Sequence, residues 1–285
     1  MAEGSSSAAD VREAQKRHWT SVADAWAKWF HWTQRNFAPL TILLRERTGW
    51  EPGAAILDIG CGSGYPALAA AAAVRPSGTV TAIDASPKML AVTAARAAAD
   101  GLDNVDVLEM DAENLRFADE TFDAVTDVCT LMFSPEPERA ASEIRRVLKP
   151  HGRFGIVVWD DPAFNPFSML ILGVIRKFIA LPPLPEPTAP GPFRFAAAGA
   201  LESVVRAGGF ANPTVERLVM TFEFESVDEY LHVVTDVTGW RRRMEVLCAD
   251  DVSNLKVALT ETVRPFIQNG HVCLQATVRC AFGCK

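Results

Sequence analysis

Two features are scarce in this sequence of 285 residues, and each scarcity argues against a class of protein. Long apolar runs are scarce: the longest, residues 167–184, is interrupted by Arg176, Lys177 and prolines, and is too short to cross a bilayer. Basic residues are also scarce, with 28 Lys and Arg against 35 Asp and Glu. The short apolar runs lead us to expect no membrane-inserted segment. Because nucleic-acid-binding domains carry a basic surface, we also expect no nucleic-acid partner.

Export signals and metal motifs are missing as well. Residues 1–19 contain no apolar segment of the kind that a secretory signal needs. The six cysteines include no CxxC pair. We therefore expect a cytoplasmic protein with reduced thiols and no metal site.

Short apolar runs alternate with helical segments through the middle of the chain. The pattern predicts strands at 54–59, 78–84, 104–111, 121–128 and 153–159, and helices at 66–74, 86–101 and 137–152. Such alternation is typical of a doubly wound α/β fold with a mostly parallel sheet. Two further alternating runs, 218–226 and 271–282, predict an antiparallel pair at the edge of this sheet.

The remaining segments predict a helical cap around this core. Apolar residues recur at helical spacing through residues 8–48, and prolines break the pattern between 161 and 196. We therefore divide the chain into an N-terminal helical lid (1–49), a core (50–160), a cap insertion (161–196) and the remainder of the core (197–285). This last part contains a helical insertion at 226–268.

A glycine-rich turn follows the first predicted strand, in the segment LDIGCGSG (57–64). A strand, a glycine turn and a helix N-terminus together form a cradle for a ligand. The dinucleotide pattern G-x-G-x-x-G fails from Gly60, because Tyr65 stands where the third glycine belongs, although Gly62 begins a variant that ends in Ala. An acid followed by G-x-G-x-G fits the segment without a gap.

Two further acids end the next strands. Asp84 lies 24 residues after Gly60, where a carboxylate accepts ribose hydroxyls. Asp111 ends the third strand, where a carboxylate can accept from an adenine amino group and the Ala112 N–H can donate to a ring nitrogen. Each acid alone could be a strand-end cap, but with the glycine turn they indicate an adenosyl ligand.

The chain resembles class I S-adenosylmethionine-dependent methyltransferases, in the methyltransferase type 11 group that includes the ubiquinone and menaquinone C-methyltransferases. The resemblance rests on ILDIGCGSG, VTAIDASPKML, MDAENLRFADETFDAV and EIRRVLKPHGRFGIVVW, and weakens towards the C-terminus. It implies a seven-stranded Rossmann-like sheet, S-adenosylmethionine as cofactor and S-adenosylhomocysteine as product. The cofactor residues it implies are Asp58, Gly60, Cys61, Gly62, Gly64, Asp84, Ala85, Met89, Asp111, Ala112, Glu113 and Cys129.

The residues that bind the methyl acceptor are harder to recognise in the sequence than those that bind the cofactor. Some small-molecule O-methyltransferases of this group carry a His pair where this chain has Met132 and Phe133, so no base is expected at that place. If the reaction uses a general base, the candidates are His31 and Asp160. The aromatic and apolar residues near the strand ends predict an apolar or aromatic small-molecule acceptor, of quinone or secondary-metabolite type. The acceptor residues we predict are Trp26, Trp29, Phe30, Met132, Phe133 and Trp159.

Two alternative functions stay open at this stage. The chain could be an adenosyl-ligand-binding module without transfer activity, because the binding motif would look the same. It could also be an NAD-dependent oxidoreductase, against which Tyr65 and the G-x-G-x-G form argue. The sequence predicts no oligomeric state.

Overall fold

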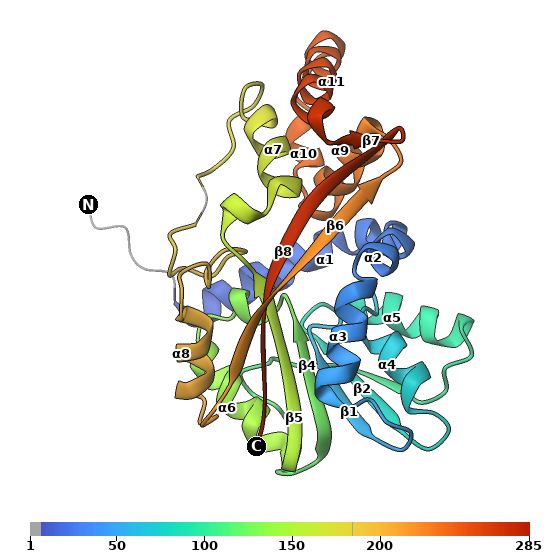
Figure 1. Cartoon of the computed structure of the whole chain (residues 1–285), viewed down its shortest axis with the longest axis vertical. Helices are drawn as coiled ribbons and strands as arrows, with labels where there is room; N and C mark the ends of the chain where they lie inside the picture. Colours follow the sequence, from blue (N-terminus) through green and yellow to red (C-terminus); the bar gives the residue numbers. More distant parts are fainter. Residues whose placement is uncertain (1–6, 184) are drawn as a thin grey trace.

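The strands form one mixed sheet in the order β3-β2-β1-β4-β5-β8-β6, with β7 paired to β8 (Figure 1). The structure is a computed structural model and describes residues 7–183 and 185–285. Strands β1 to β5 run parallel, and β8 is antiparallel to both β5 and β6. The strands are β1 (Ala55–Ile59), β2 (Thr79–Asp84), β3 (Val105–Glu109), β4 (Phe122–Val128), β5 (Leu148–Trp159), β6 (Thr214–Phe224), β7 (Ile267–Gln268) and β8 (His271–Cys284).

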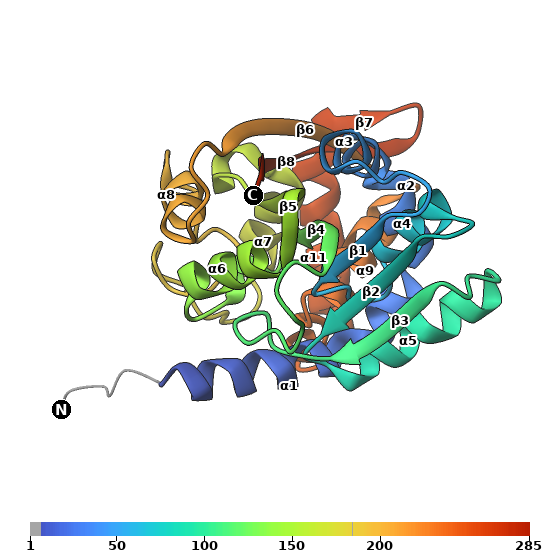
Figure 2. The same cartoon turned by 90° about the horizontal axis from the view of Figure 1, so that it is seen from below.

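Helices cover both faces of the sheet and gather over one end of it (Figures 1 and 2). Helices α3, α4 and α5 pack on one face, and α6 and α8 on the other. The helices are α1 (Ala8–Lys28), α2 (Phe30–Asn36), α3 (Ala38–Thr48), α4 (Ala67–Val74), α5 (Pro87–Ala99), α6 (Pro137–Val147), α7 (Pro166–Ile175), α8 (Ala200–Ala207), α9 (Val227–Val237), α10 (Arg241–Met244) and α11 (Ala249–Val263). The doubly wound α/β architecture predicted from the sequence is confirmed.

The antiparallel pair at the sheet edge is also confirmed. Strand β8 pairs with β5 through Cys280 opposite Val157, and with β6 through Ala276 opposite Met220. The alternate residues of β8 that the pattern placed on one face are all buried: Val272, Leu274, Ala276, Val278, Cys280 and Phe282. The upper ends of β6 and β8 reach beyond the parallel strands into the cap (Figure 1).

The helical segment predicted at 8–48 is confirmed but is divided, and the helix predicted at 137–152 is shorter than expected. The segment 8–48 is not one continuous helix but three, with breaks at Trp29 and Phe37. Pro39 explains the second break, because its ring would clash with the carbonyl of Arg35 in a continuous helix; no local signal marks the first. The helix predicted at 137–152 ends at Val147, because Pro150 restricts the preceding residue to extended backbone and β5 begins at Leu148.

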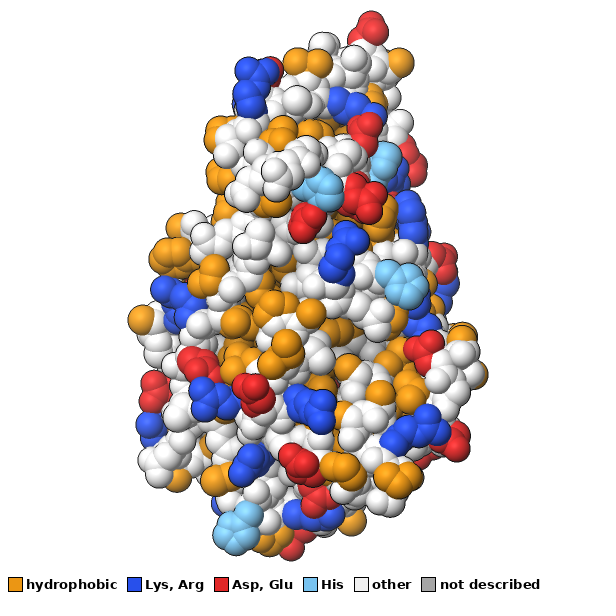
Figure 3. All heavy atoms as spheres, turned by 45° about the vertical axis from the view of Figure 1, so that its right-hand side comes forward, with side chains coloured by type: hydrophobic (Ala, Val, Ile, Leu, Met, Phe, Trp, Pro, Cys, Tyr) orange, Lys and Arg blue, Asp and Glu red, His pale blue; other side chains and the backbone are white. Residues whose placement is uncertain are grey.

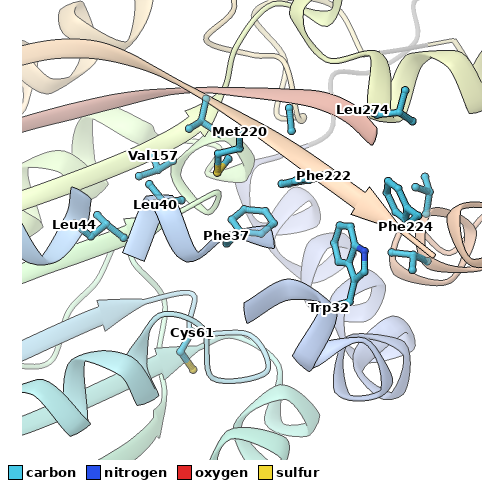
Figure 4. Close-up of a cluster of buried hydrophobic side chains, with 14 of the residues drawn as sticks. Trp32, Phe37, Leu40, Leu44, Cys61, Val157, Met220, Phe222, Phe224 and Leu274 are labelled. Carbon is cyan, nitrogen blue, oxygen red and sulfur yellow. The ribbon is translucent and has the colours of Figure 1, made fainter. Parts of the chain in front are cut away.

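One apolar cluster runs from the sheet into the cap without interruption. Figure 4 shows Leu40 and Leu44 of α3 beside Val157 of β5, and Trp32 beside Phe222 and Phe224 of β6. The Trp32 and Phe224 rings stack at 5.1 Å. The cap is therefore anchored by the same core that holds the sheet.

Two surface properties bear on the expected partners. No helix in the described part of the chain is long and apolar enough to cross a membrane. Acidic and basic side chains are interspersed on the face shown in Figure 3, and the chain has a net charge of −7.

Candidate cofactor and acceptor site

A cavity of about 800 Å³ opens at the carboxyl ends of the parallel strands. Helix α1 lines one side of it, the turn after β1 and the ends of β2 to β4 line a second, and α7, β6 and α9 close the third. Ligands of open α/β sheets bind in this position, and sites for small molecules have volumes in this range. The cavity is therefore the candidate functional site.

The glycine turn between β1 and α4 lines one end of this cavity through Gly60 and Gly62. Both have a positive φ, +66° and +54°. A Cβ at position 60 would lie 2.8 Å from the Cβ of Thr130, whereas one at position 62 would meet nothing nearer than 4.0 Å. Gly64 does not line the cavity; a Cβ there would lie 2.9 Å from Leu68 Cδ1 in α4. The first two glycines thus shape the cavity and the third lets the helix pack.

Asp84 ends β2 beside this turn and lines the cavity. Its Oδ2 accepts the Gly62 N–H at 3.0 Å, and its Oδ1 accepts the Ser86 N–H at 2.8 Å. Burial raises the pKa of Asp84, and these backbone N–H groups partly offset the increase. A carboxylate has about four acceptor positions, so Asp84 can hold the turn and still accept ligand hydroxyls.

Asp111, Ala112 and Glu113 follow β3 and line the cavity next to α1. Arg12 of α1 reaches across to them: its Nε lies 3.2 Å from Asp111 Oδ2, and its guanidinium also pairs with the buried Glu113. Glu113 Oε1 in turn accepts the backbone N–H of Glu136 at 2.8 Å. The first turns of α1 are therefore fastened over the strand ends.

Strand β4 ends in a turn with unusual backbone geometry. Cys129 lines the cavity in the left-handed region with φ +61°, a conformation that costs a non-glycine residue about 1–3 kcal/mol and recurs at functional sites. Asp127 holds the turn, because its Oδ1 accepts the N–H groups of Thr130 at 3.1 Å and Leu131 at 3.0 Å. Burial raises the pKa of Asp127 to about 7, although these hydrogen bonds oppose the rise.

Aromatic rings line the opposite part of the cavity. Of the predicted acceptor residues, Trp26, Met132, Phe133 and Trp159 line it. Trp19 of α1 contacts Phe133 edge-on at 5.2 Å between ring centroids. Phe37, Phe167 and Phe222 join Trp159 in a contiguous group, with centroid separations from 4.9 to 6.3 Å. We call these four residues the aromatic wall.

Besides Gly64 and Asp160, four predicted site residues lie outside the cavity lining. His31 is exposed on α2, so its position gives no support to a role as general base. Trp29 donates from Nε1 to Asp236 Oδ2 at 2.8 Å, and Phe30 packs under the Arg96 guanidinium at 3.8 Å. Asp58 is fully buried behind the glycine turn.

Asp58 connects β1 to β4. Its Oδ1 accepts from Thr126 Oγ1 at 2.7 Å. Burial raises the pKa of Asp58 to about 8, with Thr126 opposing the rise and Asp127 adding to it.

Sequence reasoning missed Arg12 and His18, which both line the cavity from α1. Arg12 lies seven residues before Trp19, on the same face of the helix, and that spacing was the available signal. Its partners, however, come from a loop about a hundred residues further along the chain, which no local pattern shows. Burial lowers the pKa of His18.

Comparison with known proteins agrees with this geometry. Residues 57–156 match the family model described as a methyltransferase domain. The core of this chain is thus similar to a methyltransferase domain. The match begins at β1 and ends within β5, so it contains the glycine turn, Asp84, Asp111 and the β4 turn. S-adenosylmethionine is the cofactor of this family.

Two relatives with assigned names are methyltransferases. The chain is 33% identical over 183 residues to a nocamycin O-methyltransferase of Saccharothrix syringae, covering 61% of this chain and 65% of the relative. It is 38% identical over 150 residues to a demethylmenaquinone methyltransferase of Symbiobacterium thermophilum, covering 52% and 54%. The chain thus spans about half to two thirds of the length of the relatives that it matches.

Solved structures show the same fold. The YcgJ protein of Bacillus subtilis superposes with a TM-score of 0.56 at 21% identity, covering 87% of this chain and 98% of that one. A phosphoethanolamine N-methyltransferase of Haemonchus contortus, solved with S-adenosyl-L-methionine, has a TM-score of 0.56 at 18% identity, covering 99% and 61%. The [4+2]-cyclase SpnF has a TM-score of 0.53 at 25% identity, covering 85% and 79%.

The region matched by the family model has the features that an adenosyl cofactor requires. Gly62 faces open space, so the backbone can be approached closely, and Asp84 beside it keeps acceptor capacity for ribose hydroxyls. Met89, buried at the start of α5, also lines the cavity and offers an apolar surface for a base. The residues present therefore fit S-adenosylmethionine.

Proposed function

We propose that this protein transfers a methyl group from S-adenosylmethionine to an apolar or aromatic small molecule of quinone or secondary-metabolite type. The observation that carries the proposal is the single cavity, in which the cofactor residues and the aromatic wall face one space. The names of the two relatives, a nocamycin O-methyltransferase and a demethylmenaquinone methyltransferase, support this acceptor class.

The bound cofactor supplies an activated methyl group on a sulfonium, and the protein supplies position. Asp84 and the glycine turn fix one ligand, and the aromatic wall fixes the other at the far side of the Cys129 turn. Holding two reactants in line can contribute several kcal/mol to the rate. Helix α1 lines one side of the cavity, from Arg12 beside Asp111 to Trp19 beside Phe133, and so limits the access of water.

The test combines ligand binding with product detection. We expect S-adenosylhomocysteine to bind in calorimetry and NAD not to bind. Asp84→Ala should weaken S-adenosylhomocysteine binding by about 1.5–3 kcal/mol for each charged hydrogen bond that is lost. Asp100→Ala, an exposed acid at the end of α5, serves as the matched control and should bind normally.

Turnover decides between this proposal and its alternatives. Mass spectrometry should show addition of one methyl group to members of a panel of phenols, quinones and amines. A protein that binds S-adenosylhomocysteine and methylates nothing in the panel would instead be a binding module, and the [4+2]-cyclase shows that this fold is not restricted to methyltransferases. Binding of NAD without the adenosyl ligand would indicate an oxidoreductase.

A further inference from the structure

Charged side chains occupy only one part of the cavity. Its Asp, Glu, Lys and Arg lining residues come from the first half of α1, from the ends of β2 and β3, and from the loop after β3. Asp84, Asp111 and Arg12 are examples. The lining residues of α2, α7, β6 and α9 include no charged side chain. We call these lining residues, together with the aromatic wall, the acceptor half.

Three hydroxyls of the acceptor half or next to it are already paired within the protein. Ser168 Oγ donates to Asn165 O at 3.2 Å, and Thr238 Oγ1 donates to Val234 O at 2.6 Å. The Tyr65 hydroxyl donates to Phe37 O at 2.9 Å. These hydroxyls can accept from a ligand, but their protons are committed, so they do not solvate an anion well.

An ionic acceptor would therefore lose its hydration without gaining an oppositely charged partner. Moving an unpaired charge from water into such surroundings costs far more than stacking on a ring returns. A cation could gain from the faces of the rings, but it would sit beside the sulfonium of the methyl donor, and like charges repel strongly in a poorly hydrated space. An uncharged ring avoids both costs.

We infer that the methyl acceptor binds as an uncharged, planar ring compound seated on the aromatic wall, and that the missing charges of the acceptor half exclude carboxylate and ammonium analogues. The inference rests on the proposed function and narrows it. It makes Met169 of α7 a position where a single charge would change specificity, because Met169 lines this half and is only partly buried.

Three ring compounds of equal size and different charge test this inference. These are 2-naphthol, 2-naphthoate and (2-naphthyl)methylammonium, titrated at pH 7 with S-adenosylhomocysteine present and followed by intrinsic tryptophan fluorescence. We expect 2-naphthol to bind at least about 100-fold more tightly than either ion. Affinities within threefold of one another, tighter binding of an ion, or no binding of any of the three would overturn the inference.

A charge-reversal experiment shows whether the cavity causes the selectivity. Met169→Lys places a cation of similar length in the acceptor half and should shift the affinity ratio of 2-naphthoate to 2-naphthol at least tenfold towards the anion. Met169→Leu is the matched control and should leave the ratio unchanged. If Met169→Lys does not fold, as judged by circular dichroism, Val237→Lys in α9 makes the same test. An unchanged ratio in a folded lysine variant counts against the inference.

The two proposals can fail separately. Binding of the naphthalene compounds requires no turnover, so selectivity is measured even if no methylated product is found. Conversely, a methylated carboxylate or amine in the product panel would support methyl transfer and contradict the uncharged acceptor.

Discussion

Position 60 leaves no room for a side chain, and this makes Gly60 the sharpest single-residue test of the cofactor site. Gly60 and Gly101 both have a positive φ, +66° and +65°. A Cβ at Gly60 would overlap the Thr130 side chain, whereas one at Gly101 would meet nothing within 4 Å. The two glycines thus differ in their surroundings and not in their backbone conformation.

We expect Gly101→Ala to cost about 1 kcal/mol of stability and to leave ligand binding intact. Gly60→Ala should cost about 1–3 kcal/mol more, because the Cys129–Thr130 turn has to move. The affinity of the Gly60→Ala variant for S-adenosylhomocysteine should also fall at least tenfold. Thermal denaturation and calorimetry on both variants measure this, and equal behaviour of the two would show that the turn tolerates a side chain.

Asp127 makes the stability of the protein depend on pH. Its pKa is about 7 in the folded protein, well above the usual value of an unfolded aspartate. A raised folded pKa contributes stability that is fully present below the unfolded pKa and is lost as pH rises through the folded pKa. The loss from Asp127 therefore falls between about pH 4 and pH 8, and Asp58 acts in the same direction.

Asp127→Asn should remove this contribution while keeping an oxygen for the Thr130 and Leu131 N–H groups. The melting temperature of the variant minus that of the wild type should therefore rise between pH 5 and pH 8. Comparing the two proteins also cancels the opposite effect of His18, whose pKa is lowered by burial. Asp100→Asn, on the exposed end of α5, is the control and should give a constant difference. A constant difference for Asp127→Asn would contradict the prediction.

At the scale of elements, sequence patterns predicted best where a residue's role is set by its own segment. Ser86 caps α5 by accepting the Met89 N–H, and Pro87 follows at the first helical position. Both features depend only on residues that are consecutive in the sequence. The cofactor side of the site was predictable for a related reason, because parallel strands bring their carboxyl ends to one edge and Asp84 and Asp111 each end a strand.

The acceptor side was harder to predict because distant segments build it. Phe222 of β6 contacts Phe167 of α7 in the folded protein. The two residues are far apart in the sequence, so no local pattern predicts this contact. His31 was predicted as a site residue but lies outside the cavity, and the reason is different. The prediction treated the apolar stripe of residues 8–48 as if it continued along one helix. The break at Trp29 starts a new helix, and its exposed face carries His31.

Helix α1 is an element whose removal should separate folding from function. Its deeply buried residues are Val22 and Ala23, whereas the following α2 buries Phe30 and Trp32 in the main body of the protein. We expect deletion of residues 1–28 to leave a folded protein with a cooperative thermal transition. Turnover should be lost, because α1 supplies Arg12 and Trp19 to the cavity. Near-normal activity in the truncated protein would show that α1 is not needed to close the site.

At the scale of the whole molecule, the cap and the sheet share one core, and this determines how the protein unfolds. The main apolar cluster contains Ile56 of β1 and Val157 of β5 in the sheet, and Val233 of α9 and Leu255 of α11 in the cap. Long β6 and β8 carry the same pairing register from one part to the other, from Thr214 opposite Phe282 to Phe224 opposite Val272. A cap joined in this way cannot be exposed without breaking contacts of the sheet.

We therefore expect the sheet and cap to unfold together, although 285 residues exceed the size at which two-state behaviour is usual. Urea unfolding followed by far-ultraviolet circular dichroism and by tryptophan fluorescence should give coincident transitions. Native-state hydrogen exchange should give amides of β1 and α9 the same free energy of opening, while α1, with few buried residues, opens at lower cost. An opening of α9 that is several kcal/mol easier than that of β1 would show that the cap is a separate unit. The acceptor half would then fold and unfold independently of the cofactor site.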